Sequence, residues 1–164
     1  MLGIVNRFKS SIVVLALAAL AIVTRSQIPE KAARDQSTRV MKKDTATFID
    51  SNEVAAAFAK GGPLIENSQF KVQAGRRDAP GIVEIHLRDT DIFHILEGSA
   101  TFVTGGTAPD QQTIAPGEIR AKEIKNGESH RVSKGDVIIV PNGVPHWFKS
   151  VDGLLLYYVV KVTR

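Results

Sequence analysis

The chain has 164 residues, 43% of them hydrophobic and 23% charged, which fits one globular domain of ordinary size. It has no cysteine, which excludes disulfide bonds, thiolate metal sites and cysteine nucleophiles. The formal net charge of +4 falls to +1 without the first 26 residues, which hold three of the 21 basic residues and none of the 17 acidic ones, so no nucleic-acid partner is expected.

Residues 1–26 are typical of an export signal. Arg7 and Lys9 precede an uncharged apolar run, Ile12 to Val23, that is shorter than the roughly 20 residues of a membrane-spanning helix. An uncleaved membrane anchor is the alternative interpretation. Both interpretations predict export to the periplasm or beyond, with membrane contact only through this segment. Residues 27–44 are polar and lack periodicity, which predicts a flexible linker.

The remaining residues, 45–164, are predicted to form one domain with a single short helix at its start. Asp50 as N-cap, with Glu53 three residues later, resembles a capping box. The helix is therefore predicted over 53–60, with Gly61-Gly62-Pro63 ending it.

Short strands separated by glycine-containing turns follow from Gln69 onward. They are predicted at 70–73, 81–87, 91–103 (a hairpin turning at 97–98), 119–124, 129–133, 137–140, 146–150 and 154–162. Regularly spaced short strands of this kind predict an all-β sandwich or barrel.

The segment Gly135 to Phe148, GDVIIVPNGVPHWF, is the most informative part of the sequence. A Gly-Asp turn precedes an apolar strand, and Pro141 to Gly143 turn the chain. His146 is then the first polar residue of a new strand. If that strand alternates, this histidine points into the barrel.

This segment resembles the second motif of the cupin superfamily, in which Gly, five residues, Pro, one residue, Gly, two residues and His follow in order. Gly135, Pro141, Gly143 and His146 occupy these positions, and Ser150 stands where the family often has Asn. The resemblance covers about residues 69–162. It implies a cupin-type jelly-roll β-barrel and a homodimer, since small cupins commonly pair through strand edges.

The first cupin motif is present in altered form within PGIVEIHLRDTDIFHILEGSATFVTGG. His86 falls on the second histidine of the family pattern, Glu84 stands at the position of the first, and Asp91 stands where Glu is usual. The resemblance therefore implies a metal site at His86, Asp91 and His146, with Glu84 as a fourth ligand or as a catalytic acid/base.

The residues themselves support convergence of these four side chains. Glu84 and His86 are two apart on a strand and share a face. The turn at 87–90 is expected to bring Asp91 back on the adjacent strand, and His146 comes from a strand distant in sequence. Two imidazoles with one or two carboxylates suit a divalent first-row metal such as Mn, Fe, Ni or Zn.

A metal-free pocket is the alternative. Two buried carboxylates repel each other without a nearby cation, so one would stay protonated. That cation could be an arginine, because Arg76 and Arg77 lie on the preceding strand within reach of Glu84.

Other histidines and aromatic residues are placed by strand alternation. His94 is expected on the outer face, and His130 shares the parity of Val132, which predicts the core side. Phe148 is expected to line the pocket beside His146, whereas Trp147 is expected outside or at an interface.

Three functions remain open. The first is a metal-dependent enzyme for a small molecule, with oxygenase, isomerase or lyase chemistry, in which Glu84 is the general base if it is not a ligand. The second is a non-catalytic, metal-free module that binds a small ligand. The third is a structural domain near the membrane. A nucleophilic hydrolase is disfavoured because no Gly-x-Ser-x-Gly turn occurs.

Overall fold

The computed structural model describes residues 45–164, and the predicted signal segment and linker lie outside the described residues. The elements are α2 (Ser51–Lys60), β1 (Gly62–Glu66), β2 (Phe70–Arg77), β3 (Val83–His86), β4 (Asp89–Glu97), β5 (Ser99–Thr104), β6 (Gln112–Ala115), β7 (Glu118–Ala121), β8 (Glu128–Ser133), β9 (Val137–Val140), β10 (His146–Val151) and β11 (Leu155–Thr163). Within 45–164, no helix has the length and apolarity that a membrane crossing requires.

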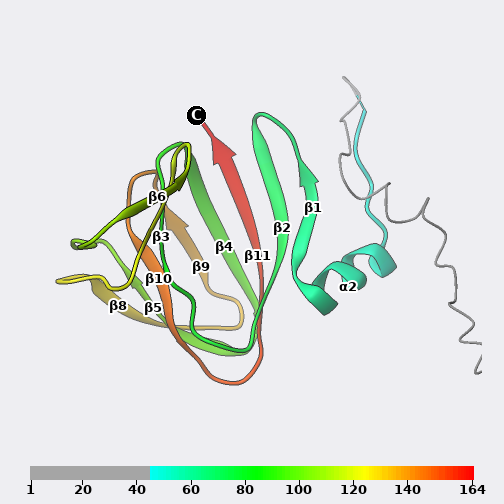
Figure 1. Ribbon diagram of the computed structural model, residues 1–164. Coiled ribbons are helices and arrows are strands. Elements are labelled where there is room, and N and C mark those ends of the chain that lie inside the picture. Colours follow the sequence, from blue (N-terminus) through cyan, green and yellow to red (C-terminus); the bar gives the residue numbers. More distant parts are fainter. Residues whose placement is uncertain (1–44) are drawn as a thin grey trace, which may run out of the picture.

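The strands form two antiparallel sheets that face each other (Figure 1). The five-stranded sheet has the order β1-β2-β11-β4-β9, and the six-stranded sheet has the order β6-β7-β3-β10-β5-β8. Consecutive strands often lie in different sheets, as β3 and β4 do. The predicted all-β jelly-roll barrel with one short helix is confirmed.

Helix α2 is capped as the sequence predicts. Asp50 Oδ1 accepts hydrogen bonds from the backbone N–H groups of Asn52 and Glu53, at 2.8 and 3.1 Å. The helix begins at Ser51, two residues earlier than predicted, and Gly61 ends it with a positive φ of 73°. The ring of Phe58 packs on that of Tyr158, at 5.0 Å between centroids, which places α2 on the five-stranded sheet.

Each predicted strand is present, but β1 and β6 were not predicted. Both are edge strands. In β1 the proline at position 63 hides the strand signal, although proline is tolerated where no ladder partner needs its N–H. All four residues of β6 are exposed, so this strand has no apolar alternation to reveal it.

The core lies between the sheets and draws on both. Its buried members are Phe93, Ile95, Ala100, Phe102, Val132, Val140, Phe148, Leu155, Tyr157 and Val159. A second, smaller cluster of Val83, Ile85, Ala108 and Ala121 packs on the opposite face of β3. Because side chains alternate along a strand, β3 directs its polar residues, Glu84 and His86, toward the space between the sheets.

Gly75 of β2 is required by close packing. It lies opposite Tyr157 in the ladder, and a Cβ at this position would overlap the tyrosine ring. Gly75→Ala is therefore expected to lower the free energy of unfolding by about 1–3 kcal/mol through overpacking. Urea unfolding measures this, and an unchanged midpoint and slope would show that the ring can move aside at no cost.

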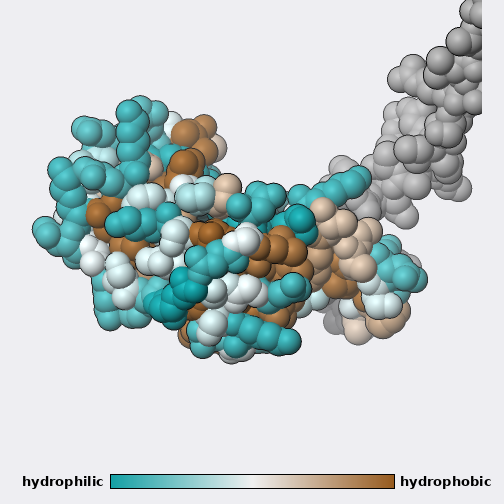
Figure 2. Space-filling view, turned by 90° about the horizontal axis from the view of Figure 1, so that it is seen from below, coloured by the Kyte–Doolittle hydropathy of each residue, from teal (hydrophilic) through white to brown (hydrophobic). Residues whose placement is uncertain are grey.

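The outer face of the five-stranded sheet is apolar near its β9 edge. Val137 and Ile139 are 60% and 63% exposed, and Ile139 lies beside Ile92 of β4. Seen from below in Figure 2, hydrophobic side chains also gather in patches between hydrophilic ones. Exposed apolar side chains on an edge strand favour association with another surface.

Candidate metal centre

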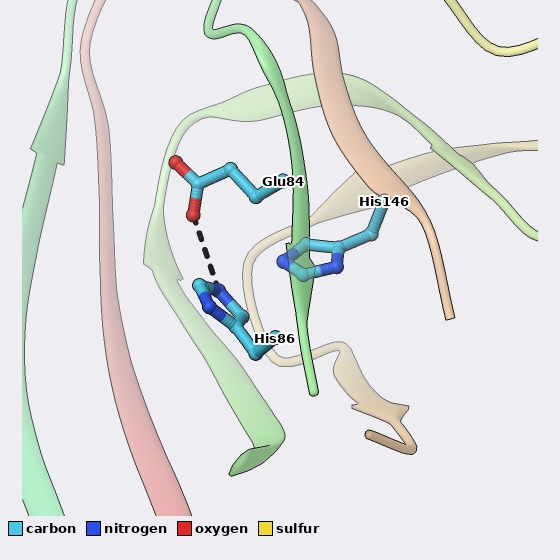
Figure 3. Close-up of side chains that lie close together, drawn as sticks. All are labelled: Glu84, His86 and His146. Carbon is cyan, nitrogen blue, oxygen red and sulfur yellow. Dashed lines mark ion pairs between the residues drawn. The ribbon is translucent and has the colours of Figure 1, made fainter. Parts of the chain in front are cut away.

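Two neighbouring strands of the six-stranded sheet carry the three central side chains. Glu84 of β3 lies directly opposite His146 of β10, and His86 follows two residues later on the same face of β3. Figure 3 shows the three side chains converging from these two strands. One ligand atom from each of them lies within 4.8 Å of the others.

A carboxylate on the next strand fixes the ring of His86. Glu118 of β7 pairs with His86 in the ladder, and His86 Nδ1 lies 2.8 Å from Glu118 Oε2. Arg120 donates a hydrogen bond to the same carboxylate at 3.2 Å. A carboxylate that holds the Nδ1–H of a histidine in this way leaves the other ring nitrogen, Nε2, to face a metal.

A lysine from the opposite sheet contacts that nitrogen. Lys161 Nζ of β11 lies 2.9 Å from His86 Nε2 and 2.5 Å from Asp91 Oδ2 of β4. An ammonium group only donates, so Nε2 accepts and the proton of a neutral His86 is on Nδ1. Burial lowers the pKa of His86, but the surrounding carboxylates, Glu84 first, raise it above its ordinary value.

His146 and Asp91 each keep a buried polar atom without a partner among the described residues. His146 Nδ1 donates to the carbonyl oxygen of Val144 at 3.2 Å, which leaves the lone pair of Nε2 facing the cluster. Neither His146 Nε2 nor Asp91 Oδ1 has a hydrogen bond. A buried acceptor without a donor is costly, so this site is suited to a cation.

Burial lowers the pKa of His146 to about 4. The unfolded chain has a value near 6.5 and so takes up this proton first, which makes folding stability fall as the pH drops from 6.5 to 4. We expect this residue to cost the metal-free protein about 3 kcal/mol over that window. The raised pKa of His86 has the opposite effect on stability, because the folded state binds this proton more tightly than the unfolded chain and so gains stability as the pH falls.

Urea unfolding at pH 7 and pH 4 tests this expectation, with His146→Asn as the comparison. The wild-type protein should lose more stability on acidification than the variant does. Equal losses would show that His146 titrates normally in the folded protein.

Glu84 is ionised. Burial alone would raise the pKa of its carboxyl, but His86, Arg120 and His146 favour the charged form and hold it at about 2. Arg77 of β2 also lies close, with Nη2 3.6 Å from Glu84 Oε1. The ion pair between an arginine of the preceding strand and Glu84 is therefore present, and Arg77 rather than Arg76 makes it.

A cavity of about 140 Å³ adjoins the cluster. Its polar lining includes Arg77, Glu84, Asp91, His146 and Lys161, and its apolar lining includes Ile82, Phe93, Trp147, Phe148 and Val159. The cavity is smaller than the pockets of roughly 300 Å³ and more that hold drug-sized ligands, which favours a small ligand.

The residues present fit a divalent metal. Glu84 supplies a carboxylate oxygen, and His86 and His146 each turn Nε2 toward the cluster. Imidazole and carboxylate ligands in this number suit first-row metals and do not by themselves select one. Lys161 Nζ already contacts one of these nitrogens, so a metal would have to compete with an internal cation.

A family model described as cupin matches residues 41–164. The chain belongs to the cupin family. The match includes both motifs, so the resemblance carried by Gly135, Pro141, Gly143 and His146 is confirmed at the level of the family.

One solved structure with a TM-score above 0.5 supports this fold. The BH2720 protein of Bacillus halodurans has a TM-score of 0.52 at 15% identity, over 76% of this chain and 87% of that one. KdgF from Halomonas sp. has 0.44 at 15% identity, over 63% and 79%. The conserved SPY1581 protein of Streptococcus pyogenes has 0.45 at 18% identity, over 63% and 73%. None of the curated proteins matches the sequence significantly.

The structure brings the four predicted site residues of this cupin together. His86 Nε2 and His146 Nε2 lie 3.5 and 3.6 Å from Asp91 Oδ2. Asp91 differs from the other three because its carboxylate pairs with Lys161. It also arrives on β4 of the opposite sheet, not on a strand paired with β3, so the expected adjacent strand was wrong.

The other placements from strand alternation hold in part. Phe148 is buried and lines the cavity, and His94 is exposed on the outer face, as predicted. His130 shares the face of Val132 and lies opposite the buried Phe102, as its parity predicts, but its side chain is 44% exposed because β8 is an edge strand. Trp147 packs outside the main core, as predicted, against the cluster of Val83, Ile85, Ala108 and Ala121; it also borders the cavity, and its Nε1–H donates to the Gly81 carbonyl at 2.8 Å.

Sequence reasoning missed Lys161 and Glu118. Lys161 has the parity of Leu155, Tyr157 and Val159, the buried face of β11, so a charged residue on that face was a usable signal. Glu118 gave no such signal, because the sequence does not show which residue of β7 lies opposite His86.

Proposed function

We propose that this cupin binds a divalent metal (Mn, Fe, Ni or Zn) through Glu84, His86 and His146, and that a small molecule is bound or transformed in the adjoining cavity. The unpartnered, buried Nε2 of His146, turned toward an ionised carboxylate and a second imidazole, carries this proposal. When bound, the metal would supply a Lewis acid or an oxygen-binding centre for isomerase, lyase or oxygenase chemistry.

The protein's own residues have distinct parts in this proposal. Glu118 orients His86, and Val144 orients His146 through its carbonyl oxygen. A carboxylate with a pKa of about 2 is a weak base, which favours Glu84 as a ligand over the catalytic base that the sequence also allowed. Asp91 holds Lys161 in the site.

Metal content tests the proposal. The protein is purified without a histidine tag, analysed for bound metals, stripped with a chelator and titrated with Mn²⁺ and Zn²⁺. About one metal per chain is expected. A folded protein that carries no metal and binds neither ion in excess would overturn the proposal.

That result would favour the second candidate, a metal-free binding module. The contact of Lys161 with both His86 and Asp91 is the specific observation on its side, because the lysine already provides the cation that buried carboxylates need. Glu84 would then be balanced by Arg77.

Export through residues 1–26 and homodimer formation are also part of the proposal. The exposed Val137 and Ile139 on edge strand β9 support a surface for a second copy. Light scattering should give twice the chain mass, and Ile139→Glu should shift the protein toward monomer. A monomeric wild-type protein at micromolar concentration would overturn the dimer.

A further inference from the structure

The cavity beside the metal centre is electrically balanced as it stands. Its charged lining residues are two acids, Glu84 and Asp91, and two bases, Arg77 and Lys161. His146 would add no charge as a ligand, because an imidazole binds a metal in its neutral form. A divalent ion on Glu84, His86 and His146 would leave two positive charges uncompensated in a cavity with apolar walls. Such an excess favours an anionic ligand.

Arg77 is placed to receive that ligand. Its side chain is one-quarter exposed, whereas the Lys161 side chain is nearly buried, so Arg77 lies on the more open side of the cavity. Its Nε donates to the Tyr157 hydroxyl at 3.0 Å, and its guanidinium lies over the ring of Phe148, 5.3 Å from the centroid. These contacts hold the planar group in a fixed direction.

The outer nitrogens of this guanidinium remain available. Arg77 Nη2 is 3.6 Å from Glu84 Oε1, beyond the 2.7–3.2 Å of a hydrogen bond. In the part of the chain that the structure describes, the bond to Tyr157 is the one side-chain hydrogen bond of Arg77. Gly81, whose Cβ would lie 2.8 Å from Nη1, leaves room for this side of the group. A carboxylate binds the fork of an arginine through two parallel hydrogen bonds.

We propose that the metal-loaded cavity takes a small carboxylate anion, and that Arg77 binds the carboxylate group. The inference rests on the proposed metal site and adds the class of ligand to it. The apolar side chains beside Arg77, Ile82, Trp147 and Phe148, would contact the carbon part of such a ligand.

Calorimetric titration of the Mn²⁺-loaded protein with pyruvate and with its uncharged analogue pyruvamide tests the inference. Pyruvate should bind at least about tenfold more tightly. Arg77→Met should weaken pyruvate binding by about ten- to a hundredfold and leave Mn²⁺ affinity within a few-fold of wild type. Arg76→Met is the matched control, because Arg76 directly precedes Arg77 in β2 and lies on the other face of the strand. This substitution should leave the affinity for pyruvate unchanged.

Two further variants keep the test decisive if Arg77→Met folds poorly. Arg77→Lys retains the charge without the fork, and Tyr157→Phe removes only the hydroxyl that holds Nε. Each should weaken pyruvate binding less than Arg77→Met does. Equal binding of pyruvate and pyruvamide, or equal effects at Arg76 and Arg77, would overturn the inference and leave the metal site standing. Failure to bind Mn²⁺ at all would overturn both.

Discussion

Replacing His86 or His146 by alanine is expected to lower the affinity for Mn²⁺ and Zn²⁺ by at least about a hundredfold. Each change removes one of three ligand atoms that lie within 4.8 Å of one another. Loss of a residue that only orients a ligand typically costs ten- to a hundredfold, so loss of the ligand itself should cost more. Metal content after dialysis and calorimetric titration measure the effect.

The chain provides matched controls for this experiment. His94 is exposed on the outer face of β4, and His130 is exposed on β8, so alanine at either position should leave metal binding unchanged. Glu118→Gln should lie between the two groups, because this residue orients His86 without facing the cluster. A protein that loses as much metal through His94 as through His146 would contradict the assignment.

Lys161→Met is expected to strengthen metal binding by about tenfold or more. The substitution removes the ammonium group that occupies the lone pair of His86 Nε2, and it frees the carboxylate of Asp91 as a further ligand. It also leaves that carboxylate buried without its cation, which should destabilise the metal-free protein by about 3–5 kcal/mol. Metal should therefore stabilise this variant far more than it stabilises the wild type.

Calorimetry and urea unfolding with and without Zn²⁺ measure both effects. Lys71→Met is the matched control, because Lys71 lies opposite Lys161 in the ladder of β2 with β11 but forms its ion pairs with Glu66 and Asp89, which are not among the candidate ligands. If Lys161→Met alone is too unstable without metal, the double variant with Asp91→Asn removes both charges of the pair. A weaker metal affinity in the single variant, with its fold intact, would show that Lys161 supports the metal and does not compete with it.

The barrel was predictable because its signals are local. Alternation, glycine turns and the spacing from Gly135 to His146 lie within short windows of sequence, and they predicted every strand that contributes to the main core cluster. The two strands that were not predicted, β1 and β6, lie at sheet edges: Pro63 hides the strand signal of β1, and the exposure of β6 removes its alternation.

The charge pairing inside the site was less predictable, because it depends on register between distant strands. Asp91 and Lys161 are 70 residues apart and meet through the ladder of β4 with β11. The sequence did not distinguish Arg76 from Arg77. Side chains alternate along β2, and its placement in the sheet turns Arg77 toward the cavity. A one-residue slip in either strand would exchange these partners.

The candidate ligands have one further property in common: Glu84, His86 and His146, together with Glu118, lie on three adjacent strands of a single sheet, β7, β3 and β10. Backbone pairing within that layer therefore sets their spacing. The opposite layer reaches them through Asp91, Lys161 and Arg77. If the two sheets separate slightly to admit a small molecule, the contact of Lys161 with His86 breaks, but the distances among the three candidate metal ligands stay the same. The metal site is therefore preorganised independently of the spacing between the sheets.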